Sequence, residues 1–499
     1  MSAVRETQTA ACEEKVVMKN LEKQFETVIG LEVHLQFKTR TKIFCGCANE
    51  FGRAPNSLTC PVCLGLPGSL PVLNKTALDY AIKVALGLHA KVNPYIKFDR
   101  KNYYYPDLPK GYQISQYDLP IARDGFVMTP TGQGPKRIGI HRAHLEEDAG
   151  KIIHDSDVKS SLVDYNRTGT PLMEIVTEPD LRSPQEAYDY LTTLKLILEY
   201  LDVSDCDMEK GSLRCDANVS VRDVGETKLR TKTELKNMNS FKAVKTALEF
   251  EVNRHQDVYR SGGAITQETR LWNEEKGMTM PMRSKEEAHD YRYFPEPDLV
   301  PFVVSEAEID RIRQTLPEFP EAKFDRLRSQ YVLGDYDAQI VVQARDVADF
   351  FEACAKLYPE AKKICNWIIG PLQQELNARK AGIAALRITP GNFTALIKKV
   401  EDGVVSNLVG KEILAMMIDS GQSADIIINE KGLAQVSDDG VLEKLIDEIL
   451  NEHAGVVDQI KQGKESAMGF LVGQAMRKTQ GKANPKKLGD MIKRRLLNV

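Results

Sequence analysis

The sequence predicts an α+β protein in which a large, mainly antiparallel sheet domain is followed by helices. From Glu26 to about Pro301, short runs of alternating polar and apolar residues are broken by Gly and Pro, as in antiparallel strands. After about Val304 the apolar spacing becomes helical, for example in 338–357 and 392–400. A chain of 499 residues is also too long for one core, so several domains are expected.

Four segments are expected along the chain. Residues 1–25 are polar and without periodicity, which predicts a flexible N-terminal tail. The sheet domain spans 26–304 and the helical domain 305–422. A last helical segment, 423–499, ends in a basic stretch.

Composition and charge limit the possible surroundings of the protein. No run approaches the roughly 18 apolar residues of a membrane-spanning helix, and the first twenty residues mix Glu and Lys instead of forming a signal core. We therefore expect a cytoplasmic protein that does not enter a membrane. The formal net charge of -4 gives no general attraction to nucleic acid, so RNA contact requires a local basic patch.

The C-terminal segment supplies such a patch. Between Lys461 and the C-terminus, its basic residues are opposed only by Glu465 and Asp490. They are Lys461, Lys464, Arg477, Lys478, Lys482, Lys486, Lys487, Lys493, Arg494 and Arg495. This charge predicts an RNA-contacting module, although the same residues could simply keep a helical surface soluble.

Four cysteines form two close pairs in the first part of the chain. They are Cys45, Cys47, Cys60 and Cys63, and Gly and Pro lie in and between the pairs. Two such pairs can close a tetrahedral thiolate site for zinc; unligated reduced thiols are the alternative. Four thiolates leave no open position for substrate, so the zinc site would brace the fold.

Acidic residues and one histidine lie on the polar faces of predicted strands. Residues 27–37 alternate almost strictly, which places Glu32 and His34 together. Asp216 and Glu234 occupy similar positions, and 146–148 closes another run with three acids. These faces could be solvent faces of half-covered sheets. Gathered on one concave sheet, they could instead hold Mg²⁺ or Mn²⁺ for phosphoryl transfer.

Several familiar motifs are missing from the sequence. There is no Gly-x-x-x-x-Gly-Lys-Ser/Thr loop and no Gly-x-Gly-x-x-Gly fingerprint, so an ATP site would have to be built from metal and sheet. There is also no Gly-x-Ser-x-Gly elbow and no Gly-Gly-Ser-Ser amidase-like segment. The chain therefore shows no means of releasing ammonia from glutamine.

Longer segments are more distinctive than any short motif. They are VIGLEVH (28–34), FDRKNYYYPD (98–107), GYQISQ (111–116), VDYNRTGTPLMEIVTEP (163–179), SLRCDAN (212–218), ELKN (234–237), DYRYFPEPD (290–298) and AMGFLVGQ (467–474). Together they closely resemble the B subunits of aspartyl/glutamyl-tRNA(Asn/Gln) amidotransferases. The resemblance covers nearly the whole chain after Glu26.

The resemblance implies a fold and a reaction. The fold is a glutamine-synthetase-like cradle, then a helical domain and a YqeY-like tail that holds tRNA. In the reaction, ATP phosphorylates the side-chain carboxylate of Glu on tRNA(Gln) or Asp on tRNA(Asn), and ammonia displaces the phosphate. The implied partners are an A subunit, an amidase-type glutaminase that makes the ammonia, and a small C subunit, in a heterotrimer.

The resemblance also implies site residues. The magnesium (or manganese) positions are Glu32, His34, Glu147, Glu174, Asp216 and Glu234. Glu32, His34 and Glu147 are the expected catalytic residues. The four cysteines match a zinc knuckle that some members of the family have.

Other residues keep two interpretations. Lys236 and Arg292 could contact phosphates or form plain ion pairs. The tyrosines at 103–105 could stack on tRNA bases or pack in the sheet. His141, His144 and His154 could support the site or lie at the surface.

Two other functions remain possible on the sequence alone. One is a non-catalytic tRNA-binding scaffold, which would gain nothing from gathering acids whose repulsion costs stability. The other is the archaeal paralogue that handles only Glu-tRNA(Gln). That protein carries an extra inserted domain, for which the spacing here leaves little room.

Overall fold

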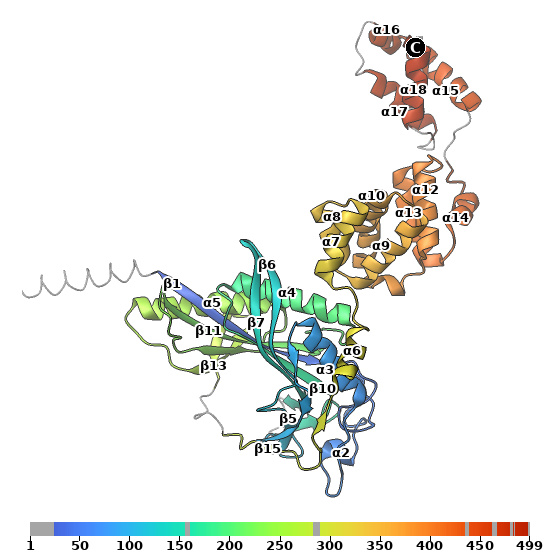
Figure 1. Ribbon diagram of the computed structural model, residues 1–499. Coiled ribbons are helices and arrows are strands. Elements are labelled where there is room, and N and C mark those ends of the chain that lie inside the picture. The colour runs from blue at the N-terminus through green and yellow to red at the C-terminus, as the bar shows by residue number, and fades with distance from the viewer. Residues whose placement is uncertain are drawn as a thin grey trace, which may run out of the picture. The chain divides into compact units, whose positions relative to one another are not determined.

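The computed structural model describes residues 24–154, 160–282, 290–434, 439–461, 467–479, 483 and 485–497. It forms two compact units, Met1–Phe319 and Pro320–Val499 (Figure 1). Nearly all of the tail expected over 1–25 lies outside the described residues, as do Lys464, Glu465 and Lys482 of the basic segment.

A nine-stranded sheet forms the centre of the first unit. Its strands, in spatial order, are β14 (Met278–Pro281), β13 (Glu268–Asn273), β12 (Thr233–Lys236), β11 (Leu213–Asp223), β1 (Phe25–Gln36), β10 (Pro171–Thr177), β7 (Gly134–Glu147), β6 (Ala122–Thr131) and β2 (Lys91–Val92). β12 and β13 run parallel, and the other described neighbours in this sheet are antiparallel. The predicted mainly antiparallel sheet is confirmed.

Smaller sheets and helices complete the first unit. The small sheets are β15 (Phe294–Pro295) with β4 (Asp99–Asn102) and β5 (Tyr112–Ser115), β16 (Phe302–Val303) with β3 (Tyr95–Ile96), and β8 (Lys151–His154) with β9 (Ser161–Asp164). The helices are α2 (Pro61–Leu64), α3 (Lys75–Gly87), α4 (Pro184–Leu201), α5 (Phe241–Arg260) and α6 (Glu306–Arg313). α4 packs on β6 and α5 on β11, so helices cover one face of the large sheet.

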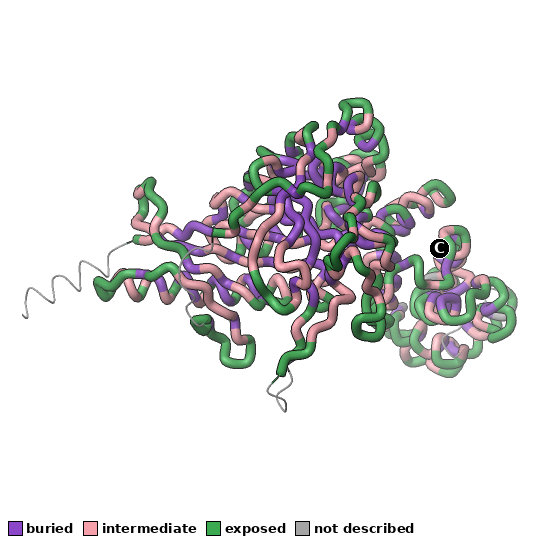
Figure 2. Tube along the Cα trace, turned by 90° about the horizontal axis from the view of Figure 1, so that it is seen from below, coloured by how far each residue is buried: buried purple, intermediate pink, exposed green. Residues whose placement is uncertain are grey.

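Alternation along β1 decides which side chains meet these helices. Ile29, Leu31 and Val33 are buried in one core cluster with residues of α4 and α5. The residues between them face the other side of the sheet, where Glu32 and His34 are only partly buried. In Figure 2 the buried segments, drawn in purple, gather in the interior of the tube. The open face of the sheet is therefore where a polar site can form.

The second unit is helical. Its first elements are α7 (Pro320–Tyr331), α8 (Asp335–Val342), α9 (Arg345–Leu357), α10 (Ala361–Trp367), a π-helix (Ile368–Leu372), α11 (Gln373–Arg379), a 3₁₀ turn (Ile383–Ala385), α12 (Pro390–Glu401), α13 (Asn407–Ser420) and α14 (Ala424–Lys431). Then follow α15 (Asp439–Glu452), α16 (Ala454–Lys461), α17 (Met468–Lys478) and α18 (Pro485–Leu497). Helices after a sheet domain were predicted, and this part of the fold is confirmed.

Two separate hydrophobic clusters lie within these helices. One runs from Leu327 to Ile428 and includes residues of α14, and the other begins at Leu442 in α15. The segment boundaries expected at 304/305 and 422/423 stay predictions. Among the described helices, none has the length and apolar character needed to cross a membrane.

Candidate functional site

The site begins on β1, the central strand of the large sheet. Glu32 lies opposite Asp216 of β11, and His34 lies opposite Glu174 of β10. The His34 Nε2 atom is 3.4 Å from Glu32 Oε1 and 3.5 Å from Glu174 Oε2. Because β1 pairs with both neighbours, one acid from each joins the two polar residues that alternation puts on its open face.

A second group of donors shares His34. The first group consists of Glu32, His34 and Asp216. The second consists of His34, Glu174 and Glu146 of β7. Within each group of three the ligand atoms are within 4.8 Å of one another. His144 adds a ring whose Nε2 is 3.3 Å from Glu146 Oε2. We call Glu32, His34, Glu146, Glu174 and Asp216 the acidic cluster.

The acidic cluster is crowded with negative charge. Burial, followed by the nearby Glu174 carboxylate, raises the pKa of Glu32 above its ordinary value. Burial also opposes ionisation of Glu174, but His144 and His34 outweigh it and lower the pKa of that carboxyl. For His34, the hydrogen bond and charge of Glu174 overcome burial and raise the pKa. Neighbouring acids thus compete for too few positive partners.

These residues fit a hard divalent cation. Carboxylate oxygens with one imidazole nitrogen are the donors that Mg²⁺ and Mn²⁺ accept. The buried Nδ1 of His144 has no hydrogen-bond partner among the described residues. A divalent cation would relieve the repulsion from Glu174 that, after burial, raises the pKa of Glu32.

Glu147 does not join the acidic cluster. Its carboxylate pairs with the ammonium of Lys110 and accepts from the backbone N–H of Ile114 at 2.9 Å. It also lines a cavity of about 150 Å³ beside Cys45 and Cys63. Side chains alternate along β7, so His144 and Glu146 share one face and Glu147 takes the other. The structure brings Glu146 to the position for which Glu147 was expected.

Glu234 lies at the edge of the acidic cluster. Its carboxylate accepts from Thr269 Oγ1 at 2.7 Å and pairs with Lys236 Nζ at 3.1 Å. Lys236 Nζ also lies 2.9 Å from Asp216 Oδ2. The sequence left two interpretations of Lys236, a phosphate contact or an ion pair. In the structure Lys236 forms ion pairs.

Sequence reasoning missed Glu146 and the residues that hold it. Ser115 of β5 donates to Glu146 Oε2 at 3.0 Å, across a contact between the small and large sheets. The signal for Glu146 was present, because it is two residues from His144 in the same run. The sequence alone does not reveal the pairing register of β7, and this register determines which of the two adjacent glutamates faces the site.

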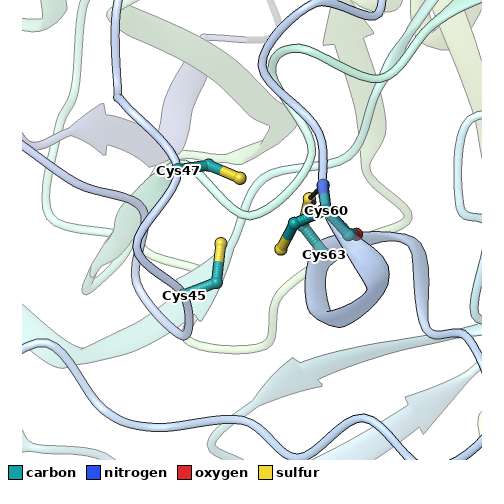
Figure 3. A group of neighbouring side chains, drawn as sticks. All are labelled: Cys45, Cys47, Cys60 and Cys63. Carbon is teal, nitrogen blue, oxygen red and sulfur yellow. Dashed lines mark hydrogen bonds between the residues drawn. The ribbon is translucent and has the colours of Figure 1, made fainter.

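The cysteine quartet forms a second candidate site (Figure 3). Cys45 and Cys47 come from the loop after β1, and Cys60 and Cys63 from the start of α2. Their four sulfurs lie within 4.8 Å of one another, which fits a tetrahedral zinc ion. A hydrogen bond with Cys45, then the backbone N–H of Cys60 and the Lys42 ammonium, lower the pKa of the Cys63 thiol to about 5. The same hydrogen bond raises the pKa of the Cys45 thiol, and burial raises that of Cys47 to about 11.

Lys42 lies buried beneath the quartet, and no pattern in the sequence indicated its burial. Its Nζ donates to Leu58 O at 2.7 Å and to Tyr165 O at 3.4 Å, and lies 3.7 Å from Cys63 Sγ. A buried ammonium is costly unless it meets acceptors and negative charge. Its place beside the thiols offsets part of the charge that four thiolates would carry.

The tyrosines and outer histidines divide between packing and exposure. Tyr104 is 89% exposed, whereas the Tyr103 ring packs edge-on against Tyr291 with centroids 5.9 Å apart. His141 pairs with Glu178 at 2.9 Å on the exposed side of β7. Among the three expected histidines, His144 reaches the acidic cluster; the side chain of His154 lies outside the described residues.

Two protein families match this chain. The family described as the GatB/GatE catalytic domain matches residues 27–310, and the family described as the GatB domain matches residues 349–496. The large sheet and its acidic cluster thus lie in the part of the chain that matches the catalytic-domain family, and most of the helices of the second unit lie in the part that matches the GatB domain.

Curated relatives are similar along nearly the whole length. A protein of Caldanaerobacter subterraneus subsp. tengcongensis is 53% identical over 95% of this chain and 99% of its own. A protein of Carboxydothermus hydrogenoformans is 52% identical over 96% of this chain and 100% of its own length. A protein of Myxococcus xanthus is 50% identical over 95% of this chain and 98% of its own length. Each is named as the B subunit of an aspartyl/glutamyl-tRNA(Asn/Gln) amidotransferase. This chain belongs to that family of B subunits, which confirms the resemblance.

Proposed function

We propose that this chain is the activating subunit of a tRNA-dependent amidotransferase. Its substrates are Glu-tRNA(Gln), Asp-tRNA(Asn) or both, together with ATP. The observation that carries the proposal is the acidic cluster, in which five donors from four neighbouring strands meet on the open face of the sheet. A pure scaffold has no use for such a costly arrangement of charge.

The proposed reaction has two steps. A side-chain carboxylate oxygen of the aminoacyl-tRNA attacks the γ-phosphorus of ATP, the bond to the β–γ bridging oxygen breaks, and ADP leaves. Ammonia then attacks the carbonyl carbon of the acyl phosphate. The carbon–oxygen bond to phosphate breaks, and phosphate leaves with the proton that the nitrogen loses.

The acidic cluster supports the first step. A divalent cation held there would neutralise phosphate charge during transfer. Glu32, His34, Glu146, Glu174 and Asp216 would hold that cation. Arg142, whose guanidinium is 3.8 Å from Glu174 Oε1, and Lys236 supply positive charge on either side of the donors. The substrate carboxylate must approach the γ-phosphate of ATP beside the acidic cluster, and both are negatively charged. Arg142 and Lys236 lower this repulsion.

The ammonia is proposed to come from a partner. The sequence has no amidase-like segment, and the curated relatives are named as subunits. We therefore propose an amidase-type A subunit as glutaminase and a small C subunit in a heterotrimer. The cysteine quartet is proposed to hold a structural zinc ion.

The test uses the chain assembled with its partner subunits. Ammonium chloride replaces glutamine, so that glutaminase activity does not limit the reaction. ADP and amide formation on both misacylated tRNAs are measured for the wild type and for Glu174→Gln. We expect both products to fall together in the variant while tRNA affinity is kept. Wild-type ADP formation by the Glu174→Gln enzyme would overturn the proposal and favour a scaffold.

A further inference from the structure

Lys236 is held at the rim of the acidic cluster by two carboxylates. Its Nζ is 2.9 Å from Asp216 Oδ2 and 3.1 Å from Glu234 Oε1. The side chain is 38% exposed, against 19% for that of Asp216. The ammonium is thus anchored on one side and open to a ligand on the other.

Asp216 serves two partners at once. It pairs with Lys236, and it is also a member of the group with Glu32 and His34 whose ligand atoms lie within 4.8 Å of one another. When Asp216 serves a divalent cation, it has less negative charge to offer Lys236, and the ammonium then lies beside another positive charge. The positive charge of Lys236 is then compensated by Glu234 alone, which already accepts a hydrogen bond from Thr269.

The neighbouring cations are held by longer or different contacts. Arg142 is 3.8 Å from Glu174 and hydrogen-bonds to Tyr117 O at 3.5 Å. Lys101 lies over the Tyr291 ring, 4.9 Å from its centroid. Glu174 and Asp216 are both candidate metal ligands, but Lys236 makes the shorter ion pair, at 2.9 Å, and its partner Asp216 belongs to the group with Glu32 and His34.

We propose that Lys236 contacts the terminal phosphate of the bound nucleoside triphosphate and exchanges Asp216 for that phosphate when a divalent cation occupies the acidic cluster. The inference deepens the proposed function and rests on it. A lysine binds phosphate as a mobile point charge, and its flexible stem allows the exchange without movement of β12. Lys236 is a binding residue in this account and forms no covalent bond.

The alternative is a plain ion pair that only ties β12 to β11. The two accounts agree that loss of Lys236 removes a competitor for Asp216, and so strengthens Mg²⁺ binding without nucleotide. They differ on the nucleotide. Only phosphate contact makes Lys236→Met lose affinity for a triphosphate and keep its affinity for AMP.

The experiment is calorimetric titration of the assembled complex with the β,γ-imido analogue of ATP and with AMP, both in saturating Mg²⁺. For Lys236→Met we expect the affinity for the ATP analogue to fall about ten- to a hundred-fold, the usual worth of a charge-assisted hydrogen bond. AMP affinity should be unchanged, and Lys236→Arg should restore part of the loss. Lys232→Met, which removes the same charge just before β12, is the matched control.

Each outcome decides. An unchanged ATP-analogue affinity in Lys236→Met, or an equal loss for AMP, would overturn the inference but leave the proposed function standing. A wild-type complex that binds no ATP analogue would overturn both. If Lys236→Met does not fold, Lys236→Gln keeps a polar side chain of similar length and is titrated in the same way.

Discussion

Glu146 and Glu147 are adjacent in the chain and serve opposite faces of β7. The first reaches the acidic cluster and is fixed there by Ser115 at 3.0 Å. The second pairs with Lys110 near the cysteine quartet. Two carboxylates with the same sequence neighbourhood thus have different chemistry, because a strand turns each successive side chain to the other side.

This difference gives a test at the level of single residues. Glu146→Gln should weaken Mn²⁺ binding by about ten-fold or more, since it removes a negatively charged donor from the cluster. Glu147→Gln should leave Mn²⁺ affinity unchanged, because its carboxylate points away. Calorimetric titration with Mn²⁺ measures both. Equal weakening by the two substitutions would show that Glu147 reaches the metal after all.

The sequence could predict the parts of the site that depend on one strand. Strict alternation in 27–37 is enough to place Glu32 and His34 together. Alternation in its own strand likewise places Asp216 on a polar face. It could not choose Glu146 over Glu147, because that choice depends on where β7 pairs with β10. Nor could it find Lys42, whose burial depends on carbonyls from Leu58 and Tyr165, far apart in the chain.

At the scale of elements, a buried network holds the edge of the sheet that carries Glu234 and Lys236. Glu251 of α5 is fully buried and pairs with Arg254 at 2.8 Å and Arg270 of β13 at 3.1 Å. His255 of the same helix lies 2.9 Å from Thr233 Oγ1 of β12. One helix thereby fixes two strands by charge and hydrogen bonds.

Breaking this network should cost stability. Glu251→Gln leaves two arginines without their buried counter-charge, so the free energy of unfolding should fall by about 3–5 kcal/mol. Glu249→Gln removes an exposed acid from the same helix, and its cost should be only a few tenths of a kcal/mol. Urea unfolding of both variants measures the difference. Similar small losses would mean that the network contributes little.

The same network predicts a pH dependence. Burial opposes ionisation of Glu251, but hydrogen bonds from His255, Arg254 and Thr279 prevail and hold the pKa at about 2, below its ordinary 4.5. Between these values the unfolded chain binds the proton more readily, so the stabilisation is present above pH 4.5 and is lost as pH falls toward 2. The stability gap between wild type and Glu251→Gln should shrink over that range. A constant gap would contradict the assignment.

The cysteine loop gives a further prediction at this scale. Purified protein should contain about one zinc ion per chain, because four thiolates complete its coordination. Cys63→Ser should lower both the zinc content and the melting temperature. Cys206→Ala changes another buried cysteine outside the quartet and should keep the zinc. Elemental analysis together with thermal unfolding separates the two effects, and a stable zinc-free wild type would contradict the prediction.

At the scale of the whole molecule, charge in the C-terminal helices is partly neutralised within the module. Lys478 pairs with Glu452 at 2.6 Å, and Arg495 with Asp447 at 2.8 Å. Lys493 and Arg494 are exposed on α18. The RNA contact that the sequence predicts for this segment therefore depends on fewer charges than the sequence alone suggests.

Removal of the module tests that contact. Truncation after Ala434 should weaken tRNA binding and flatten its dependence on salt, with each lost phosphate contact lowering the slope by somewhat under one unit. Lys478→Gln in the full chain should change the slope less than Lys493→Gln, because Lys478 already has an acidic partner. Filter binding at several salt concentrations measures both. An unchanged slope after truncation would mean that these charges only keep the surface soluble.

The central place of β1 has a consequence for biosynthesis. β1 is made first, yet its neighbours β10 and β11 follow much later, and its Leu31 N–H bonds to Thr177, 146 positions onward. During translation this strand, apolar on one face, keeps at least one unpaired edge until both neighbours have left the ribosome. A chaperone that binds extended apolar segments would find β1 available throughout that interval. The donors of the acidic cluster come together only when the last of these strands has been added.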